Sequence, residues 1–167
     1  MAALYDSVAY PPGSRQATVY SRNVLEAARR LGLQLHALGV SGPGDIDQAF
    51  AAATKWHAQG LHVTDTPTLL DRRLRLAELA ARSRLPAIAY LRQTAEAGFL
   101  MAYGPDLADL HRRAAVYVDK ILRGARPGNL PFELPAKFEL ILNARTARAL
   151  GLAIPASLRL RADHVLE

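Results

Sequence analysis

Residues 33–67, LQLHALGVSGPGDIDQAFAAATKWHAQGLHVTDTP, contain one complete strand–helix–strand unit and decide the fold class. Leu33–Val40 alternates loosely between apolar and polar residues and predicts a strand. The glycines and proline of SGPGD break that strand, and Asp45 can cap a helix over Ile46–Gln59. Gly60–Thr64 predicts the next strand, which closes on an Asp-Thr-Pro turn. Two strands joined by a helix favour parallel pairing.

The same alternation of strands and helices continues on both sides of this unit. The further predicted strands are Ala2–Tyr5, Pro86–Tyr90, Phe99–Tyr103 and Lys137–Asn143. The further predicted helices are Arg15–Leu31, Leu69–Arg84, Gln93–Ala97, Asp106–Leu122, Ala144–Leu150 and Ala156–Glu167. We therefore expect an α/β protein with a three-layer, doubly wound and mainly parallel sheet.

The composition changes at residues 125–135, ARPGNLPFELP, where three prolines and a glycine fall within eleven residues. This stretch predicts an extended crossover outside the sheet core. The helix before it carries an apolar residue every three to four positions, a strong stripe to bury. We expect two parts: residues 1–104 as an α/β ligand-binding lobe, and residues 105–167 as a helix, a crossover and returning strand and helix segments.

Charge and composition narrow the function classes. The 167 residues are 50% hydrophobic and carry a formal net charge of +6, yet no run of five basic residues occurs. We therefore expect solvated helix faces and no nucleic-acid partner. The chain has no cysteine, which excludes a disulfide scaffold and a thiolate metal site. Its first residues, MAALYDSVAYPPGSR, lack a signal-peptide pattern, so the chain as written is expected in the cytoplasm.

Ligands of doubly wound sheets bind beyond the carboxyl ends of the strands, so residues just after the predicted strands are the candidates. They are Asp6, Ser7, Ser41–Asp45, Thr64, Asp65, Thr66, Tyr90–Gln93, Tyr103 and Gly104. The Asp65 carboxylate, between two hydroxyl residues, can hold a ligand ammonium group by charge-assisted hydrogen bonds. It can equally form an Asx-type turn into the next helix, and the pattern favours neither.

Catalytic and cofactor motifs are missing from the sequence. SGPGD matches neither the P-loop nor the dinucleotide-binding glycine pattern, and the five histidines show no paired ligand spacing. No GxSxG motif is present, so a nucleophile elbow has no support. We expect no enzyme activity, no cofactor and no metal site. Trp56 and Tyr117 stand at helical spacing among apolar residues and are predicted to lie in the core.

Two long segments resemble a known family. They are LMAYGPDLADLHRRAAVYVDKILRGARPGNLPFE at residues 100–133 and KFELILNARTARALGLAIPASLRLRADHVLE at residues 137–167. Both are similar to the C-terminal half of ABC-transporter substrate-binding proteins related to tryptophan- and other amino-acid-binding proteins. Upstream, AARRLGLQL, DIDQAFAAA and RSRLPAIAY continue the resemblance over essentially the whole chain.

This resemblance implies lobe two of a type I periplasmic-binding-protein fold. The complete protein would hold a small solute between two lobes and signal to an ABC permease, in the periplasm. The ligand-binding positions implied here are Asp6, Ser7, Thr64, Asp65, Thr66, Tyr90, Arg92 and Tyr103. For an amino-acid-like ligand, we expect Arg92 to pair with the carboxylate and Asp65 with the amino group.

The resemblance also implies that a first lobe would precede residue 1 and would cover the helix at Asp106–Leu122. Without that lobe the helix should leave an exposed apolar patch of several hundred Å², and we predict self-association to cover it.

Two other functions remain as alternatives. A receiver-like signalling domain is one, because Asp65 closes a strand of a βα series where a phosphoacceptor would lie. Against it, the first strand supplies only Asp6, where a magnesium site needs paired acids, and no lysine follows the fifth strand. The other is a small enzyme, which would need a convergent base and nucleophile that the sequence does not show.

Overall fold

The computed structural model spans residues 1–167 and describes every side chain except those of Gln16, Val19, Tyr20, Ser21 and Pro43. Its strands are β1 Ala2–Asp6, β2 His36–Val40, β3 Leu61–Val63, β4 Ala87–Ala89, β5 Met101–Pro105, β6 Phe138–Asn143 and β7 His164–Leu166. Its α-helices are α1 Arg15–Arg30, α2 Pro43–Lys55, α3 Pro67–Asp71, α4 Arg73–Arg82, α5 Arg92–Ala97, α6 Leu107–Leu122, α7 Ala144–Leu150 and α8 Ala156–Arg161. A 3-10 turn, η1, occupies Pro127–Asn129.

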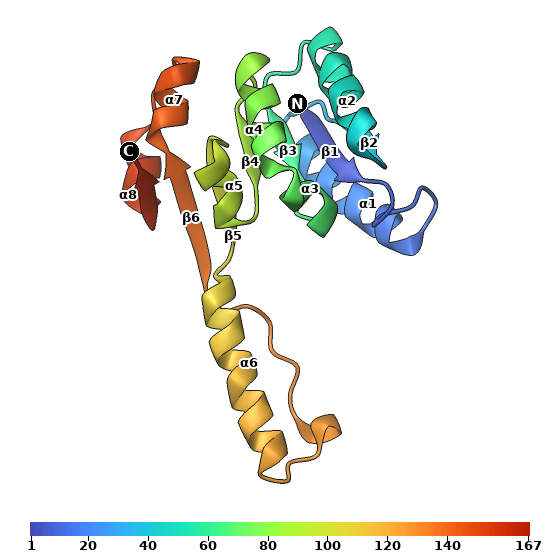
Figure 1. The fold of residues 1–167 in the computed structure, drawn as a ribbon, viewed down its shortest axis with the longest axis vertical. Coiled ribbons are helices and arrows are strands. Elements are labelled where there is room, and N and C mark those ends of the chain that lie inside the picture. The colour runs from blue at the N-terminus through green and yellow to red at the C-terminus, as the bar shows by residue number, and fades with distance from the viewer.

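All seven strands form one sheet, in the order β2-β1-β3-β4-β5-β6-β7 (Figure 1). The first five strands in this order pair in parallel, from Ala2 beside His36 to Ala89 beside Ala102. β6 runs antiparallel to β5, and β7 runs parallel to β6. The sheet is therefore mixed but mostly parallel, which confirms the predicted α/β fold class.

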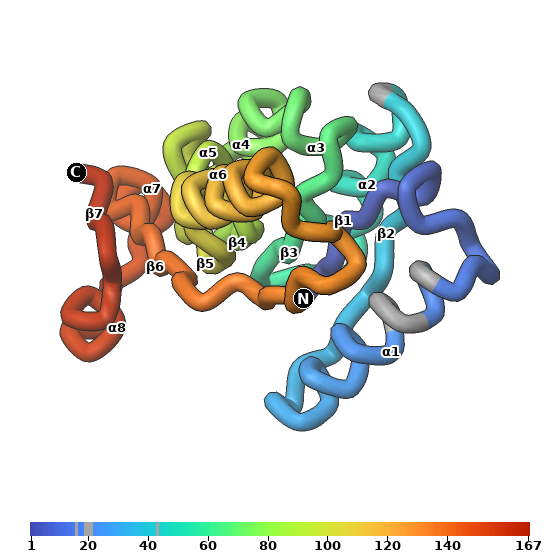
Figure 2. Tube along the Cα trace, turned by 90° about the horizontal axis from the view of Figure 1, so that it is seen from below, coloured from blue at the N-terminus to red at the C-terminus, as the bar shows by residue number. Residues whose placement is uncertain are grey.

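The core lies between one face of the sheet and the helices α2, α4 and α5, while α1 and α8 lie on the other side (Figure 2). Leu4, Leu61, Leu76 and Phe99 are each at most 2% exposed and stand at the centre of this layer. Burying such a side chain contributes about 1.5–3 kcal/mol. This one-sided core fixes the strand ends that form the candidate site.

Helix α2 begins earlier than the sequence predicts. We expected Asp45 to cap a helix over Ile46–Gln59, but Gly42 is the cap and the helix runs from Pro43 to Lys55. The Asp45 carboxylate reaches back to the Ser41 and Gly42 N–H groups, at 2.9 and 3.1 Å. Proline is favoured in the first helical turn, which explains the earlier start. Asp45 thus stabilises the start of α2 from within the first helical turn.

The predicted helix over Leu69–Arg84 is two helices. Thr66 caps α3, and the chain turns at Arg72 before α4 continues. The last predicted element, a helix over Ala156–Glu167, is wrong in its second half. The chain leaves α8 after Arg161 and forms β7, which pairs with β6. Pairing with an edge strand outweighs the local helical pattern over these few residues.

Helix α6 and residues 125–137 form an arm, a term used below for residues 107–137. The arm projects from the carboxyl edge of the sheet, away from the body (Figure 1). None of the residues of α6 is buried. Tyr117, predicted to lie in the core, instead donates its hydroxyl to the Pro131 carbonyl at 2.8 Å. Trp56 is also outside the core, 44% exposed and stacked on His36.

Residues 138–167 return from the arm to the same sheet that residues 1–104 begin, as β6 and β7. The predicted boundary after residue 104 lies close to the start of the arm. Residues 1–104 and 138–167, on either side of the arm, contribute strands to the same sheet. Within the described residues, no helix combines the length and apolarity needed to cross a membrane.

Candidate functional site

The carboxyl end of β1 carries a buried carboxylate that organises the edge of the sheet. Asp6 is 1% exposed and accepts hydrogen bonds from the N–H groups of Val8 and Ala9, at 2.9 and 3.0 Å. The Thr66 hydroxyl donates to its other oxygen at 2.9 Å. Burial alone raises the pKa of Asp6, but these hydrogen bonds outweigh it and leave the pKa below its ordinary value. Asp6 is thus an ionised structural brace.

Thr64 and Thr66, which follow β3, are also turned inward. Both are at most 5% exposed, and the Thr66 hydroxyl accepts a long hydrogen bond from Leu69 N–H at 3.4 Å as well as donating to Asp6. Ser7, between Asp6 and the loop, is half-buried. Three of the predicted site residues therefore have buried side chains, which support the loops at this edge instead of facing solvent: Asp6, Thr64 and Thr66.

Asp65 lies between these threonines but points to the neighbouring loop. Its carboxylate accepts the backbone N–H of Tyr90, which ties the end of β3 to the end of β4. Burial raises the pKa of Asp65, and the hydrogen bonds from the Tyr90 and Leu91 N–H groups offset only part of that effect. Asp65 therefore bridges to the neighbouring loop, whereas the helix that follows it, α3, is capped by the side chain of Thr66.

Tyr90 and Tyr103 form an aromatic surface at the same edge. Ala89 of β4 pairs with Ala102 of β5, and each of these residues is followed by a tyrosine; Tyr90 meets the His62 ring edge-on, with ring centroids 5.4 Å apart. Tyr90 and Tyr103 are 40% and 53% exposed. Tyr103 stacks on Phe138 of β6, with ring centroids 5.9 Å apart. The sequence did not single out Phe138, because its pairing with β5 depends on the return of the arm.

Gly104 allows β4 and β5 to end in contact. A Cβ atom at Gly104 would lie 2.9 Å from the Tyr90 carbonyl carbon and closer still to its oxygen. Only glycine fits this close approach of two backbones. The position of Tyr90, and so of the aromatic surface, depends on this residue.

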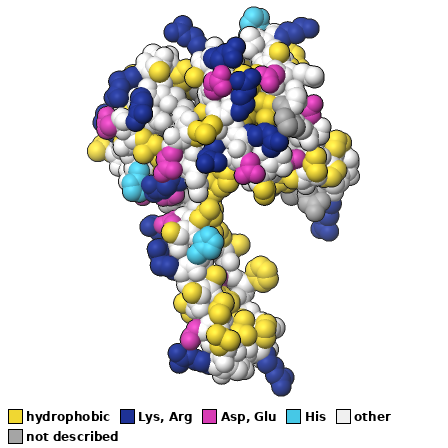
Figure 3. Space-filling model, in the orientation of Figure 1, with side chains coloured by type: hydrophobic (Ala, Val, Ile, Leu, Met, Phe, Trp, Pro, Cys, Tyr) yellow, Lys and Arg dark blue, Asp and Glu magenta, His cyan; other side chains and the backbone are white. Residues whose placement is uncertain are grey.

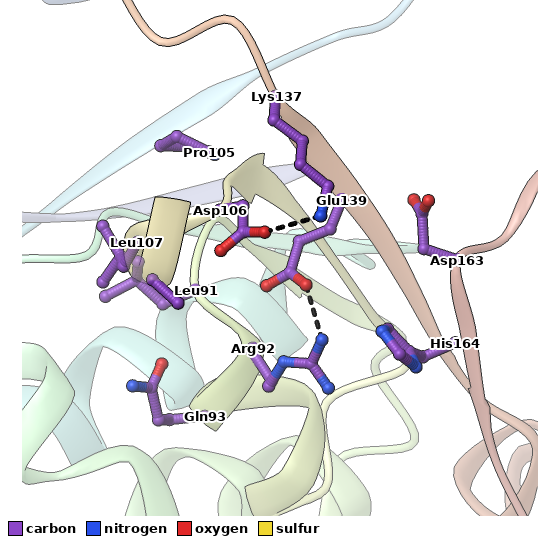
Figure 4. A pocket seen from close by; sticks show the side chains of 11 residues that line it. Leu91, Arg92, Gln93, Pro105, Asp106, Leu107, Lys137, Glu139, Asp163 and His164 are labelled. Carbon is purple, nitrogen blue, oxygen red and sulfur yellow. Dashed lines mark hydrogen bonds and ion pairs between the residues drawn. The ribbon is translucent and has the colours of Figure 1, made fainter. Parts of the chain in front are cut away.

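Arg92 opens helix α5 and lies in a charged cavity of about 510 Å³ beside the base of the arm (Figure 4). Its Nη2 atom bonds Glu139 of β6 at 2.5 Å, and the Glu139 carboxylate raises the pKa of Arg92. Asp106 and Lys137 form a second ion pair in the same cavity, at 2.9 Å. Glu139, Asp106 and Lys137 were not predicted as site residues, since their partners are more than 30 positions away along the chain.

The Asp106–Lys137 pair joins the outgoing and returning segments of the arm. Asp106 also caps α6, accepting the Asp109 N–H at 3.0 Å. Lys137 lowers the pKa of Asp106 to about 2, with help from the Asp109 N–H group. The backbone N–H of Asp106 donates to the Lys137 carbonyl at 3.0 Å. The base of the arm is therefore pinned by backbone and side chains together.

A doubly wound sheet, with polar and aromatic residues gathered at one carboxyl edge and a crossover arm leaving that edge, has the layout of a ligand-binding α/β fold. The model of the ABC transporter substrate binding protein family matches residues 7–166. The chain belongs to this family. No curated protein matches the sequence.

Solved structures share the fold at low sequence identity. An ABC domain in complex with L-Trp from Streptococcus pneumoniae is 21% identical with a TM-score of 0.86, over 99% of this chain and 54% of its own. A conserved domain protein from Vibrio cholerae is 21% identical with a TM-score of 0.85, over 98% and 53%. A ligand-free, open substrate-binding protein with adhesive properties from Clostridium difficile is 18% identical with a TM-score of 0.70, over 99% and 53%. This chain spans about half the length of each.

The family match also includes the strand end on which the receiver-like alternative depends. It covers Asp65 and every helix and strand after β1 within residues 7–166. Among the side chains that the structure describes, no group of three or more His, Cys, Asp or Glu residues is placed to hold a metal ion. The family match therefore favours solute binding over the receiver-like alternative.

Proposed function

We propose that this chain is a ligand-binding lobe of the solute-binding component of an ABC import system. In this role it binds a small amino-acid-like molecule at the carboxyl edge of its sheet and catalyses no reaction. Membership of the substrate-binding family over residues 7–166 is the observation that carries the proposal. The proposed partners are the solute and an ABC permease, and the proposed place of action is the periplasm.

The exposed side chains of the edge suit such a ligand. Tyr90 and Tyr103 offer ring faces to an apolar or aromatic side chain. Arg92 uses one nitrogen for Glu139, and its other N–H groups can bind a ligand carboxylate. Asp65 can accept a ligand ammonium group with the oxygen that does not face Tyr90. Ser7 adds a half-buried hydroxyl at the end of β1, next to Gly39 of β2.

The buried residues at this edge have a supporting role in the proposal. Asp6, Thr64 and Thr66 hold the loops after β1 and β3 in place through their mutual hydrogen bonds and caps. Preorganised loops lower the entropy that a ligand must remove on binding. The chain spans about half the length of the three solved structures named above, and in this proposal it supplies one wall of a two-walled cleft.

Calorimetric titration of the purified chain with each common amino acid tests this function. We expect heat of binding for at least one of them and a weaker affinity in Tyr103→Ala and Arg92→Met. Phe132→Ala is the matched control, because Phe132 is fully exposed on the arm, away from this edge. Absence of heat for every amino acid would refute the proposed ligand class.

Acidification gives a second readout of the same site. The ammonium-binding form of Asp65 is the ionised one, and burial raises the pKa of this carboxyl. Affinity for an amino acid should therefore fall as the pH is lowered through the raised pKa of Asp65, and Asp65→Asn should lose this dependence. An affinity that does not change on acidification would argue against the contact between Asp65 and the amino group.

A further inference from the structure

Two carboxylates at the candidate site have no cation beside them. Asp6 and Asp65 follow the neighbouring strands β1 and β3, and both accept hydrogen bonds from backbone N–H groups. Neither carboxylate forms an ion pair with a Lys or Arg that the structure describes. When both are ionised, the ends of β1 and β3 therefore carry two negative charges without a positive partner in the described chain.

The cations at the base of the arm already have acidic partners. Arg92 bonds Glu139 at 2.5 Å and Lys137 bonds Asp106 at 2.9 Å, so each pair is neutral as a whole (Figure 4). Figure 3 shows acidic and basic side chains beside one another where the arm meets the body. These pairs therefore do not offset the charges at the ends of β1 and β3.

Three other arginines belong to the helices that start near this edge. Arg15 opens α1, while Arg72 and Arg73 lie where α3 is followed by α4. Arg72 and Arg73 donate to the carbonyls of Thr68 and Leu70, at 3.1 Å each, and are thus directed along α3. Their charges lie on helices rather than at the strand ends, where ligands of such sheets bind.

A zwitterionic ligand leaves this negative charge in place. In the proposed function its ammonium group meets Asp65 and its carboxylate meets Arg92, so the ligand adds no net charge. Asp6 is 1% exposed, and the field of a buried charge is screened less by water and salt than that of an exposed one. A ligand with one further positive charge therefore gains electrostatic free energy that a neutral amino acid does not.

Two aromatic rings at this edge suit a cationic side chain. Tyr90 and Tyr103 are 40% and 53% exposed, and the face of a tyrosine ring attracts a cation. Tyr103 stacks on Phe138 and Tyr90 meets His62 edge-on, which leaves ring area for a ligand. A planar guanidinium group can also stack on such a face. The rings therefore suit a cation as well as an apolar side chain.

We propose that the solute bound by this lobe is an amino acid with a cationic side chain. The inference rests on the proposed function and adds to it the charge of the ligand. The α-amino and α-carboxylate groups keep the contacts given above, and the side chain supplies the positive charge that Asp6 and Asp65 lack. Two negative charges about 10 Å away, at an effective dielectric constant between those of a protein surface and bulk water, favour a positive side chain by about tenfold.

Calorimetric titration with L-arginine and with L-citrulline tests this inference. The two amino acids have the same length and a planar end group, but only the guanidinium group of arginine is charged. We expect arginine to bind about tenfold more tightly at low salt, and the preference to shrink at about 1 M salt, where the Debye length falls to about 3 Å. Equal affinities, or a preference that salt does not reduce, would overturn the inference.

Asp6→Asn removes the charge of a buried carboxylate and keeps an acceptor in its place. The asparagine oxygen can still accept the Val8 and Ala9 N–H groups, so citrulline should bind as before while arginine binds about threefold more weakly. Asp119→Asn is the matched control, because Asp119 lies on α6 about 20 Å beyond Asp106 and should leave both affinities unchanged. Equal weakening of both ligands in Asp6→Asn would count against the inference. If this variant does not fold, the salt dependence of the parent decides.

The same titrations separate this inference from the proposed function. A neutral amino acid that binds as tightly as arginine would keep the function and overturn the inference. Agmatine, which has the guanidinium group of arginine but no carboxylate, is the complementary probe. Heat with agmatine but with no amino acid would contradict the proposed ligand class and support the selection of positive charge. No heat with either arginine or agmatine would overturn the inference.

Discussion

Gly104→Ala should destabilise the protein more than any other glycine-to-alanine change in the sheet. The new methyl group would lie 2.9 Å from the carbonyl carbon of Tyr90, whereas carbon atoms pack at about 3.5–4.0 Å. The backbones of β4 and β5 would have to separate by at least about 0.6 Å. Since the obstacle is backbone rather than a flexible side chain, we expect the upper part of the usual overpacking penalty, about 3 kcal/mol.

The unfolded state offsets part of this loss. Alanine restricts the unfolded chain more than glycine and returns about 0.4–1 kcal/mol. The net expectation is a loss of about 2 kcal/mol, or a fall of about 1 M in the urea midpoint for a slope near 2 kcal/mol/M. Urea unfolding followed by circular dichroism, at one fixed protein concentration, measures this shift.

Gly44→Ala provides the matched control. Gly44 lies in α2, and a Cβ atom there would meet nothing within 4 Å. Alanine favours the helix by up to about 1 kcal/mol, so this variant should be as stable as the parent or slightly more stable. If Gly104→Ala instead unfolds at the same urea concentration as the parent, the close approach of Tyr90 to Gly104 is wrong.

Three further changes have defined outcomes. Asp6→Ala leaves the Val8 and Ala9 N–H groups and the Thr66 hydroxyl without their acceptor, and should cost about 3 kcal/mol in urea unfolding; a loss below about 1 kcal/mol would refute its bracing role. Leu76→Ala opens a cavity in the core and should cost about 2–5 kcal/mol, with a fall in Tm measured by calorimetry; an unchanged Tm would contradict its burial. Lys137→Met should remove a pH-dependent contribution. The pKa of Asp106 is lowered in the folded state from 3.8 to about 2, so the contribution is present above pH 3.8 and is lost as the pH falls towards 2. The difference in stability between parent and Lys137→Met should shrink over that interval, and a difference that is constant with pH would exclude the pair as its cause.

Most of the strands can be predicted from the sequence, because each shows a local pattern of apolar and polar residues. The alternation in Leu33–Val40 and the apolar run at Gly60–Thr64 each contain the strand that the structure shows. Ser14, Asp106 and Asn143 cap helices through their own side chains, at positions where such residues are favoured. β7 was not predicted, because His164–Leu166 is too short to show the alternation of a strand and owes its structure to pairing with β6.

The predicted site residues remain a prediction, and the structure shows where they lie. Asp6, Thr64, Asp65, Tyr90 and Tyr103 lie at or just beyond the strand ends of one edge of the sheet. The sequence could not show that the side chains of Asp6, Thr64 and Thr66 turn inward, because their partners come from other loops. It also could not show Glu139 beside Arg92, which requires the chain to leave the sheet, form the arm and return.

The base of the arm has a mechanical consequence. Pro105 and Phe138 belong to two neighbouring antiparallel strands, and the backbone bond and ion pair between Asp106 and Lys137 extend their connection by one residue. Two strands joined in this way cannot slide past each other without breaking these bonds. Any displacement of the far end of α6 must therefore strain the paired strands at the edge of the sheet, where Tyr103 and Glu139 lie.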